Sequence, residues 1–253
     1  MDSLLQAIDV SAGDFAILSA IAFGAGLVRG FSGFALSALV MASAVYLLPP
    51  IELIPICWWL EMSASVLMAR GGWKEADRGV VLGLVIGSTA GVPLGLMLTQ
   101  SLPVETSKLI ALVIIIALAA TQLAKIRLAF LATRPGLYLS GLTAGIATGL
   151  ASVGGMVVAL YVLSQDAPAR KMRAALVLFL FISSLTSMIY LVWFGVMDMT
   201  SVWRGAALAI PAMIGVFAGQ RLFTPKYEPY YRPFCLALLI SLSAIGLVRT
   251  SLA

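Results

Sequence analysis

The chain contains no histidine, and only 11% of its 253 residues carry a charged side chain. Soluble domains average about 25% charged residues, so this composition, with 61% hydrophobic residues, indicates an integral membrane protein. Without histidine there is no H-E-x-x-H motif and no Ser-His pair, and the sequence offers no credible set of metal ligands. We therefore expect neither an enzyme nor a metalloprotein, and no cofactor.

Cysteine and long polar blocks are scarce as well. Cys57 and Cys235 both fall within apolar segments, where a thiol usually behaves as a small buried hydrophobe. Because no long polar stretch separates the apolar segments, we expect a single all-α membrane domain over residues 1–253. The first 28 residues hold three aspartates and no lysine or arginine, so they lack the basic region of a cleaved signal peptide.

Apolar segments cover most of the chain. They lie at roughly 14–28, 32–48, 51–69, 79–99, 106–124, 136–150, 154–164, 174–194, 203–222 and 233–249. The first two and the sixth and seventh are short. At about 1.5 Å per residue they reach roughly 16–25 Å, less than the ~30 Å hydrocarbon core. We expect these four to be half-helices and the other six to be full spans.

Basic residues orient the chain in the membrane. Twelve of the 16 lysines and arginines follow the third, fifth, seventh and ninth segments: Arg70, Lys74, Arg78, Lys125, Arg127, Arg134, Arg170, Lys171, Arg173, Arg221, Lys226 and Arg232. The positive-inside rule assigns those loops to the cytoplasm and leaves Lys108, Arg204 and Arg249 outside. Since topology explains the basic pI of about 9.4, no nucleic-acid partner is needed.

This topology fixes each short pair of segments as a hairpin with an even number of crossings. The N-terminus and the C-terminus then both lie outside. The segment lengths favour a re-entrant hairpin whose tip stays inside the bilayer, and two short tilted spans are the alternative.

The two halves of the chain resemble each other. Gly26 and Gly30 recur as Gly145 and Gly149 at an offset of 119, and Gly91 and Gly95 recur as Gly215 and Gly219 at an offset of 124. We expect two inverted-topology repeats, 14–124 and 136–249, each a glycine-rich helical hairpin followed by three transmembrane helices.

A glycine stands at every fourth residue of the fourth segment, from Gly79 to Gly95. Such ridges of small residues let helix backbones pack closely in lipid, and close packing is the expected role. The alternative is that Ser88 and Thr89 of the same segment line a pathway.

Two glycine-rich breaks, residues 24–34 and 145–155, interrupt the apolar segments. Irregular backbone at membrane depth is tolerated only where protein buries it or where it faces a water-filled cavity. Ser32 and Ser152 are placed to cap the half-helices that follow, and helix N-termini attract anions. Arg29 adds a positive charge and a planar donor fork suited to oxyanions. The predicted anion site comprises Arg29, Gly30, Ser32, Gly33, Ser152, Gly154 and Gly155.

Alternative roles remain open for the site residues. The glycines serve only turn geometry in one interpretation, and Arg29 snorkels to an interface in another. Glu61, an acid deep within a long apolar span, either carries a coupling proton or pairs with a cation such as Arg29. With no histidine, a proton step on the protein falls to a carboxylate such as Glu61.

The glycine-rich hairpin that opens each half, the duplication, and the G-x-x-x-G pattern of Gly91 and Gly95 resemble the sulfite exporter TauE/SafE family. The resemblance implies a secondary transporter of the bacterial cytoplasmic membrane, without an ATPase of its own, for sulfite, sulfonates or related organosulfur anions. Proton-coupled export is the expected mode. An uncoupled anion channel, or a permease for another small carboxylate or oxyanion, is the alternative. Thr148 stands where a second arginine would match Arg29, so the charge contribution is asymmetric.

Overall fold

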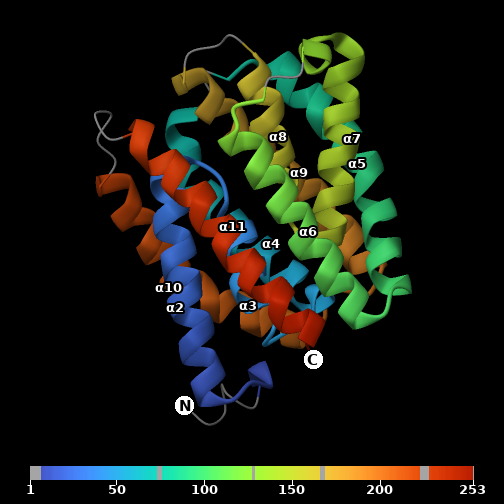
Figure 1. Cartoon of the computed structure of the whole chain (residues 1–253), viewed down its shortest axis with the longest axis vertical. Coiled ribbons are helices and arrows are strands. Elements are labelled where there is room, and N and C mark those ends of the chain that lie inside the picture. The colour runs from blue at the N-terminus through green and yellow to red at the C-terminus, as the bar shows by residue number, and fades with distance from the viewer. Residues whose placement is uncertain (1–6, 73–75, 127–128, 166–168, 223–227, 253) are drawn as a thin grey trace.

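The protein is described here by a computed structural model covering residues 7–72, 76–126, 129–165, 169–222 and 228–252. Lys74, Arg127 and Lys226 of the basic loops lie outside these ranges. Within them the chain is helical, with no strand (Figure 1). The helices are α2 (Ala12–Ser32), α3 (Leu36–Ala44), α4 (Pro50–Gly72), α5 (Arg78–Ser101), α6 (Val104–Leu123), the 3-10 helix η1 (Ala129–Ala132), α7 (Arg134–Ala151), α8 (Gly154–Ser164), α9 (Ala169–Trp193), α10 (Met199–Leu222) and α11 (Glu228–Leu252).

Seven helices of the described chain are long and apolar enough to cross a membrane: α2, α4, α5, α6, α9, α10 and α11. The prediction of a short half-helix at 14–28 is wrong, because α2 continues through its glycines for 21 residues. Two of those glycines are contact points on α10. A Cβ on Gly26 would lie 2.2 Å from the carbonyl oxygen of Ala212, and one on Gly30 would lie 2.3 Å from that of Val216.

α3 and α8 are the short helices, with nine and eleven residues. At about 1.5 Å per residue, neither reaches across a ~30 Å hydrocarbon core. After α3 the chain is back at the end where α2 began, because Arg204 of α10 contacts both Glu52 in the first turn of α4 and the backbone of Ile8 just before α2. The first pair of helices therefore starts and ends at the same end of the bundle.

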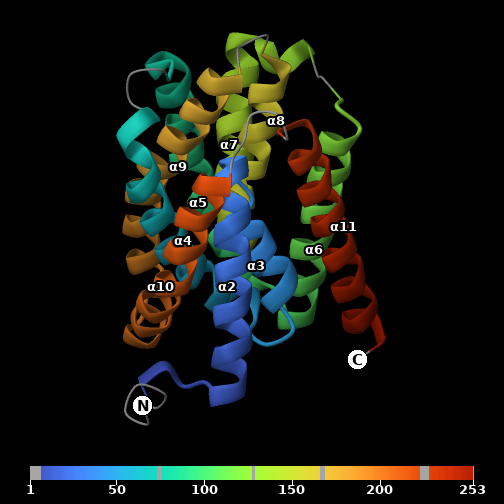
Figure 2. The same cartoon turned by 90° about the vertical axis from the view of Figure 1, so that its left-hand side faces the viewer.

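Glycine ridges join the helices in two close pairs. α5 lies beside α7 (Figure 1), and α2 lies beside α10 (Figure 2). A Cβ on Gly91 of α5 would lie 2.2 Å from the carbonyl oxygen of Leu142, and one on Gly215 of α10 would lie 2.1 Å from that of Phe23. Only glycine lets the backbones approach this closely, so the predicted packing role of the ridges is confirmed.

The contacts of one pair correspond to those of the other. A Cβ on Gly145 would meet the carbonyl oxygen of Ser88 at 2.2 Å. The repeat offsets of 119 and 124 relate Gly145 to Gly26 and Ser88 to Ala212. A Cβ on Gly26 would also lie 2.2 Å from the carbonyl oxygen of Ala212. Each close pair thus joins a helix from one half of the chain to a helix from the other half.

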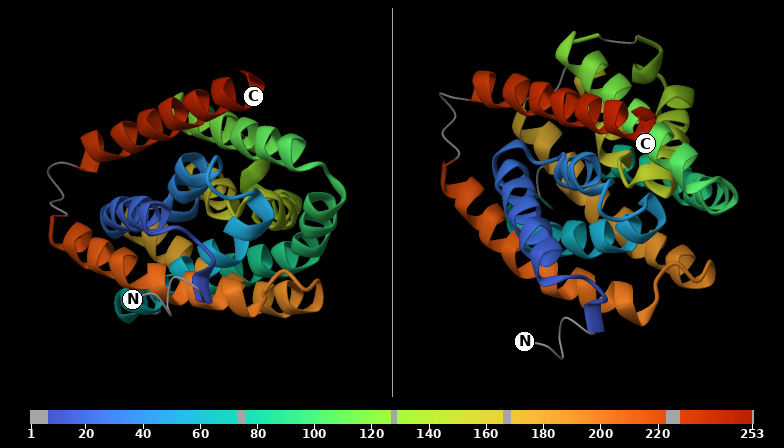
Figure 3. Two further views of the ribbon diagram at one scale, coloured as in Figure 1. Left: turned by 90° about the horizontal axis from the view of Figure 1, so that it is seen from below. Right: turned by 60° about the horizontal axis from the view of Figure 1, so that its bottom comes forward.

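α6 and α11 pack against each other along one side of the bundle (Figure 3). They are the least buried of the seven candidate spans. In each of them, 28% of the most apolar 18-residue stretch is buried inside the molecule. Their remaining apolar surface suits contact with lipid. The helices α4, α5 and α9 are more deeply buried, with 50%, 56% and 56% of the corresponding segment inside the molecule.

Candidate functional site

The first break follows α2. Gly33 adopts the left-handed conformation (φ 82°), and its N–H donates to the carbonyl of Arg29 over 2.9 Å, which ends the helix. Ala35 is also left-handed (φ 73°) and precedes α3. Ser32 is not the N-cap that the sequence predicts: its hydroxyl donates to the carbonyl of Phe34 over 2.8 Å and so closes the turn.

The second break follows α7 and has the same kind of helix end. Ser152 is left-handed (φ 57°), and its N–H donates to the carbonyl of Thr148 over 2.8 Å. The N–H of Val153 reaches back to the carbonyl of Ala147 over 3.2 Å, so a second carbonyl at the end of α7 has a partner. Ser152 therefore terminates α7. The prediction that it caps α8 is wrong, because α8 begins after Val153 without a side-chain cap.

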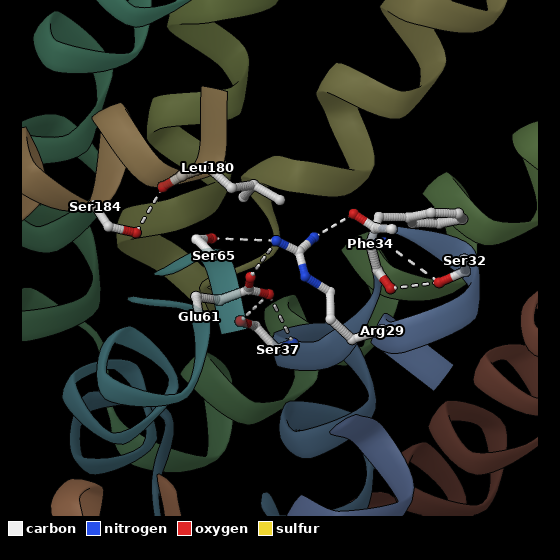
Figure 4. A network of polar contacts seen from close by, with 9 residues as sticks. Arg29, Ser32, Phe34, Ser37, Glu61, Ser65, Leu180 and Ser184 are labelled. Atoms are coloured by element: carbon white, nitrogen blue, oxygen red, sulfur yellow. Dashed lines mark hydrogen bonds and ion pairs between the residues drawn. The ribbon is translucent and has the colours of Figure 1, made fainter. Parts of the chain in front are cut away.

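Arg29 is completely buried and faces inward from the last turn of α2 (Figure 4). Its Nη2 lies 3.3 Å from Oε2 of Glu61 and donates to the hydroxyl of Ser65 over 3.2 Å. Its Nη1 donates to the carbonyl of Gly33. These contacts rule out the snorkelling interpretation and show Glu61 as the partner of Arg29, one of the two roles expected for that acid.

The same carboxylate lies at the start of α3. Oε1 of Glu61 accepts a hydrogen bond from the hydroxyl of Ser37 over 2.9 Å and a longer one from its backbone N–H over 3.3 Å (Figure 4). Ser37 is in the first turn of α3, where N–H groups have no acceptor within the helix. A protein carboxylate thus occupies the helix end that the sequence analysis assigned to a bound anion.

A cavity lies beside Glu61, between α4, α5, α9 and the second break. The volume of this cavity is about 40 Å³, which is enough for a few water molecules or a small oxyanion. Its walls are formed by Ile54, Trp58, Glu61, Val92, Leu96, Thr148, Gly149, Ser152, Gly154, Gly155, Phe179, Leu180, Ser183, Ser184, Ser187 and Leu191. Five of the seven polar side chains in this lining carry a hydroxyl group: Thr148, Ser152, Ser183, Ser184 and Ser187.

The predicted site residues divide between two places. Glu61, Ser152, Gly154 and Gly155 line the cavity. The remaining four, Arg29, Gly30, Ser32 and Gly33, are absent from its walls and belong to the first break. Arg29 touches the cavity lining only through Glu61, and Gly30 is fixed by its close contact with α10.

The two glycines that begin α8 differ in their surroundings. A Cβ on Gly154 would lie 2.1 Å from Oγ1 of Thr148 and 2.4 Å from the carbonyl oxygen of Ala144, so this position accepts no side chain. A Cβ on Gly155 would lie 3.1 Å from a terminal carbon of Leu180, which can move. Gly154 holds α8 against α7, whereas Gly155 borders the cavity where a side chain would project.

Sequence reasoning missed the hydroxyl groups of α9. Ser183, Ser184 and Ser187 all line the cavity. Trp58 fixes this helix by donating its indole N–H to the carbonyl of Ser184 over 2.7 Å, and Ser183 lies 3.2 Å from Ser88, oxygen to oxygen. The available signal was the cluster of serines inside the apolar segment 174–194, since polar residues within a span often mark a pathway.

The described residues include no group of three or more His, Cys, Asp or Glu side chains that could hold a metal ion. Glu61 is the acid among the cavity walls, and its neighbours there are hydroxyl, amide and apolar groups. This arrangement can bind a small polar ion or carry a proton.

Comparison with known proteins identifies the family. The family model for the sulfite exporter TauE/SafE matches residues 18–246, nearly the whole chain. No curated protein and no solved structure was found to match. The chain therefore belongs to the sulfite exporter TauE/SafE family, whose members are membrane transporters of sulfite or related anions.

Proposed function

We propose that this protein is a proton-coupled secondary transporter that moves a small sulfur oxyanion or organosulfonate across a bacterial cytoplasmic membrane. The observation that carries the proposal is the hydroxyl-rich cavity at the meeting point of the second break, α9 and Glu61. Buried hydroxyls and free helix N–H groups are donors without fixed charge. They can bind an oxyanion while still letting it leave, as transport requires.

The proposed substrate contacts lie on two sides of the cavity. On one side, the N–H groups of Gly154 and Gly155 stand in the first turn of α8, where a helix has a partial positive charge and no internal acceptors. On the other side are the serine hydroxyls of α9. In the resting state Arg29 holds Glu61 at the cavity wall, and the carbonyl of Gly33 in turn accepts a hydrogen bond from Arg29.

Glu61 is the proposed site of the coupling proton. It borders the cavity and lies in the middle of α4, far from either end of that helix. An anion placed beside a carboxylate favours the protonated form of that carboxylate, because like charges repel strongly in a low dielectric. Anion and proton would therefore enter the site together.

Two inverted repeats would supply the conformational change. The matching glycine contacts of the α5–α7 and α2–α10 pairs support a pseudo-two-fold relation between residues 14–124 and 136–249. Rocking one set of helices against the other around a fixed central cavity would expose the cavity to each face in turn. Both termini are proposed to lie outside.

Ligand-induced stabilisation of the purified protein tests the substrate class. Sulfite, thiosulfate, sulfoacetate, taurine and sulfate would be compared, and at least one sulfur anion is expected to raise the melting temperature. Ser187→Ala is expected to reduce that shift. Ser243→Ala should preserve the melting shift, since Ser243 is also buried but lies on α11 outside the cavity wall. Equal shifts in wild type and Ser187→Ala would place the anion elsewhere.

A further inference from the structure

The surroundings of the Glu61 carboxylate have the composition of an anion-binding site. Three donors converge on it: the guanidinium of Arg29, and the N–H and hydroxyl of Ser37 at the first turn of α3. A buried arginine fork and a helix N-terminus are the groups that proteins use to hold free oxyanions. Here the bound anion is a side chain of the protein itself.

One carboxylate does not use all the donors of this site. Arg29 is 0% exposed, yet its Nε has no hydrogen-bond partner among the described residues. Oε2 of Glu61 likewise accepts no well-aligned hydrogen bond from them, although it lies 3.3 Å from Nη2. Nε of Arg29 therefore remains available as a donor to a ligand that has more oxygen atoms than one carboxylate.

Glu61 also separates these donors from the cavity. Its side chain lines the cavity wall, whereas Arg29, Ser37 and Ser65 do not. If the carboxylate moved aside, the cavity would extend directly to the guanidinium of Arg29 and the start of α3.

We propose that Glu61 is a built-in occupant of a latent anion site, which the transported oxyanion takes over once Glu61 is protonated. A proton from the bulk aqueous phase, relayed as hydronium through the water of the cavity, adds to Oε2, and the side chain becomes a neutral carboxyl group. Its attraction to Arg29 is then lost, so the substrate anion can replace it on Arg29 and Ser37. One proton enters with each anion. The identity of that anion rests on the proposed function, whereas the latent site does not.

Few other charges face Glu61 from the helices packed on α4. Arg29 of α2 is the cation in contact with it, and Cys57 of α4 itself adds a thiol nearby. Arg173 of α9 lies at the first break and donates to the carbonyl of Gly30 over 2.7 Å. Arg204 of α10 pairs with Glu52 at the far end of α4. Proton uptake by the site is thus expected to depend on Glu61 and Arg29.

Chemical rescue tests the latent site without any assumption about the substrate. Glu61→Ala removes the built-in carboxylate, so formate should bind in its place and raise the melting temperature by roughly 5 °C at about 100 times its Kd. Formate should raise the melting temperature of wild type much less at neutral pH, because there the ionised Glu61 fills the site. It should also have no effect on the double variant Arg29→Gln, Glu61→Ala. The proposal would be contradicted if formate stabilised the double variant as much as Glu61→Ala. It would also be contradicted if formate did not stabilise Glu61→Ala.

The second measurement keeps the proposal testable if Glu61→Ala does not fold. Methanesulfonate stays ionised at all accessible pH values, so any proton taken up on its binding is taken up by the protein. Wild type is expected to bind it up to tenfold more tightly per unit fall in pH, and Glu61→Gln to bind it with no pH dependence. The same pH dependence in both proteins would overturn the switch. Formate rescue of Glu61→Ala without sulfonate or sulfite binding to wild type would support the latent site and contradict the proposed substrate.

Discussion

At the scale of single residues, Arg29 and Glu61 neutralise each other within the bundle. Both are buried, and an isolated charge at this depth costs several kcal/mol. The pair is held at three further points, through Ser65, Gly33 and Ser37. Such a pair stays together at rest and separates only when one charge is removed, which is what a proton-coupled step needs.

Removing the positive partner tests this description. Arg29→Ala leaves Glu61 buried without a counter-charge, and we expect a loss of about 3–5 kcal/mol in the free energy of unfolding, together with loss of transport. Arg29→Lys keeps the charge but cannot reach Glu61, Ser65 and Gly33 at once, so its loss should be smaller. Denaturant unfolding in detergent measures both. Wild-type stability in Arg29→Ala would mean that the pair is not formed.

A second residue-scale prediction concerns the cavity wall. Gly155→Val places a branched side chain against Leu180 and toward the proposed anion, so it should abolish the melting shift produced by sulfite while the protein remains folded. Gly154→Val is the contrasting variant. Its side chain would collide with the backbone of Ala144, and we expect it not to fold. An undiminished sulfite shift in Gly155→Val would contradict the assigned site.

At the scale of helices, glycine contacts determine how the bundle packs. Gly91→Ala and Gly215→Ala insert a methyl group within 2.2 Å and 2.1 Å of a backbone oxygen, so each is expected to destabilise the fold by about 1–3 kcal/mol. Gly24→Ala is the matched control, because a Cβ there meets nothing within 4 Å. It should be neutral or stabilising by up to about 1 kcal/mol. Equal effects at all three positions would show that the ridges do not pack as described.

The helices also show what sequence reasoning can reach. Hydropathy and the fourfold glycine spacing predicted the helical class, the long spans and the packing ridges, because these depend on local composition. The sequence pattern predicted too short a helix for α2. A glycine that interrupts a helix and a glycine that contacts a neighbouring helix cannot be told apart in the sequence. Gly26 and Gly30 are of the second kind, and only Gly33 ends the helix.

Part of the candidate site could also be predicted from the local sequence. A buried charge inside an apolar segment is conspicuous, so Arg29 and Glu61 were found. The capping roles of Ser32 and Ser152 were wrong, because a serine beside a glycine break suits either the end of one helix or the start of the next. The serines of α9 became significant only when folding placed them opposite the second break.

At the scale of the whole molecule, the positive-inside rule places η1 and the start of α7 in the cytoplasm and the start of α6 outside. Ala132→Cys and Val104→Cys introduce thiols at exposed positions at these two ends, and both native cysteines are buried. An impermeant maleimide added to intact cells should label Val104→Cys and spare Ala132→Cys. The opposite pattern would invert the topology, and labelling of both would contradict this arrangement of helices.

The most direct test of the whole account is uphill transport by purified protein in proteoliposomes. Methanesulfonate would be placed at equal concentration on both sides of the membrane, and a pH gradient would then be imposed. The account predicts net accumulation of the sulfonate on the alkaline side in wild type, driven by protons that move with it, and none in Glu61→Gln. If wild type lets the sulfonate equilibrate across the membrane but does not accumulate it, the protein is an uncoupled channel. If Glu61→Gln accumulates the sulfonate as much as wild type does, Glu61 has no part in the coupling step.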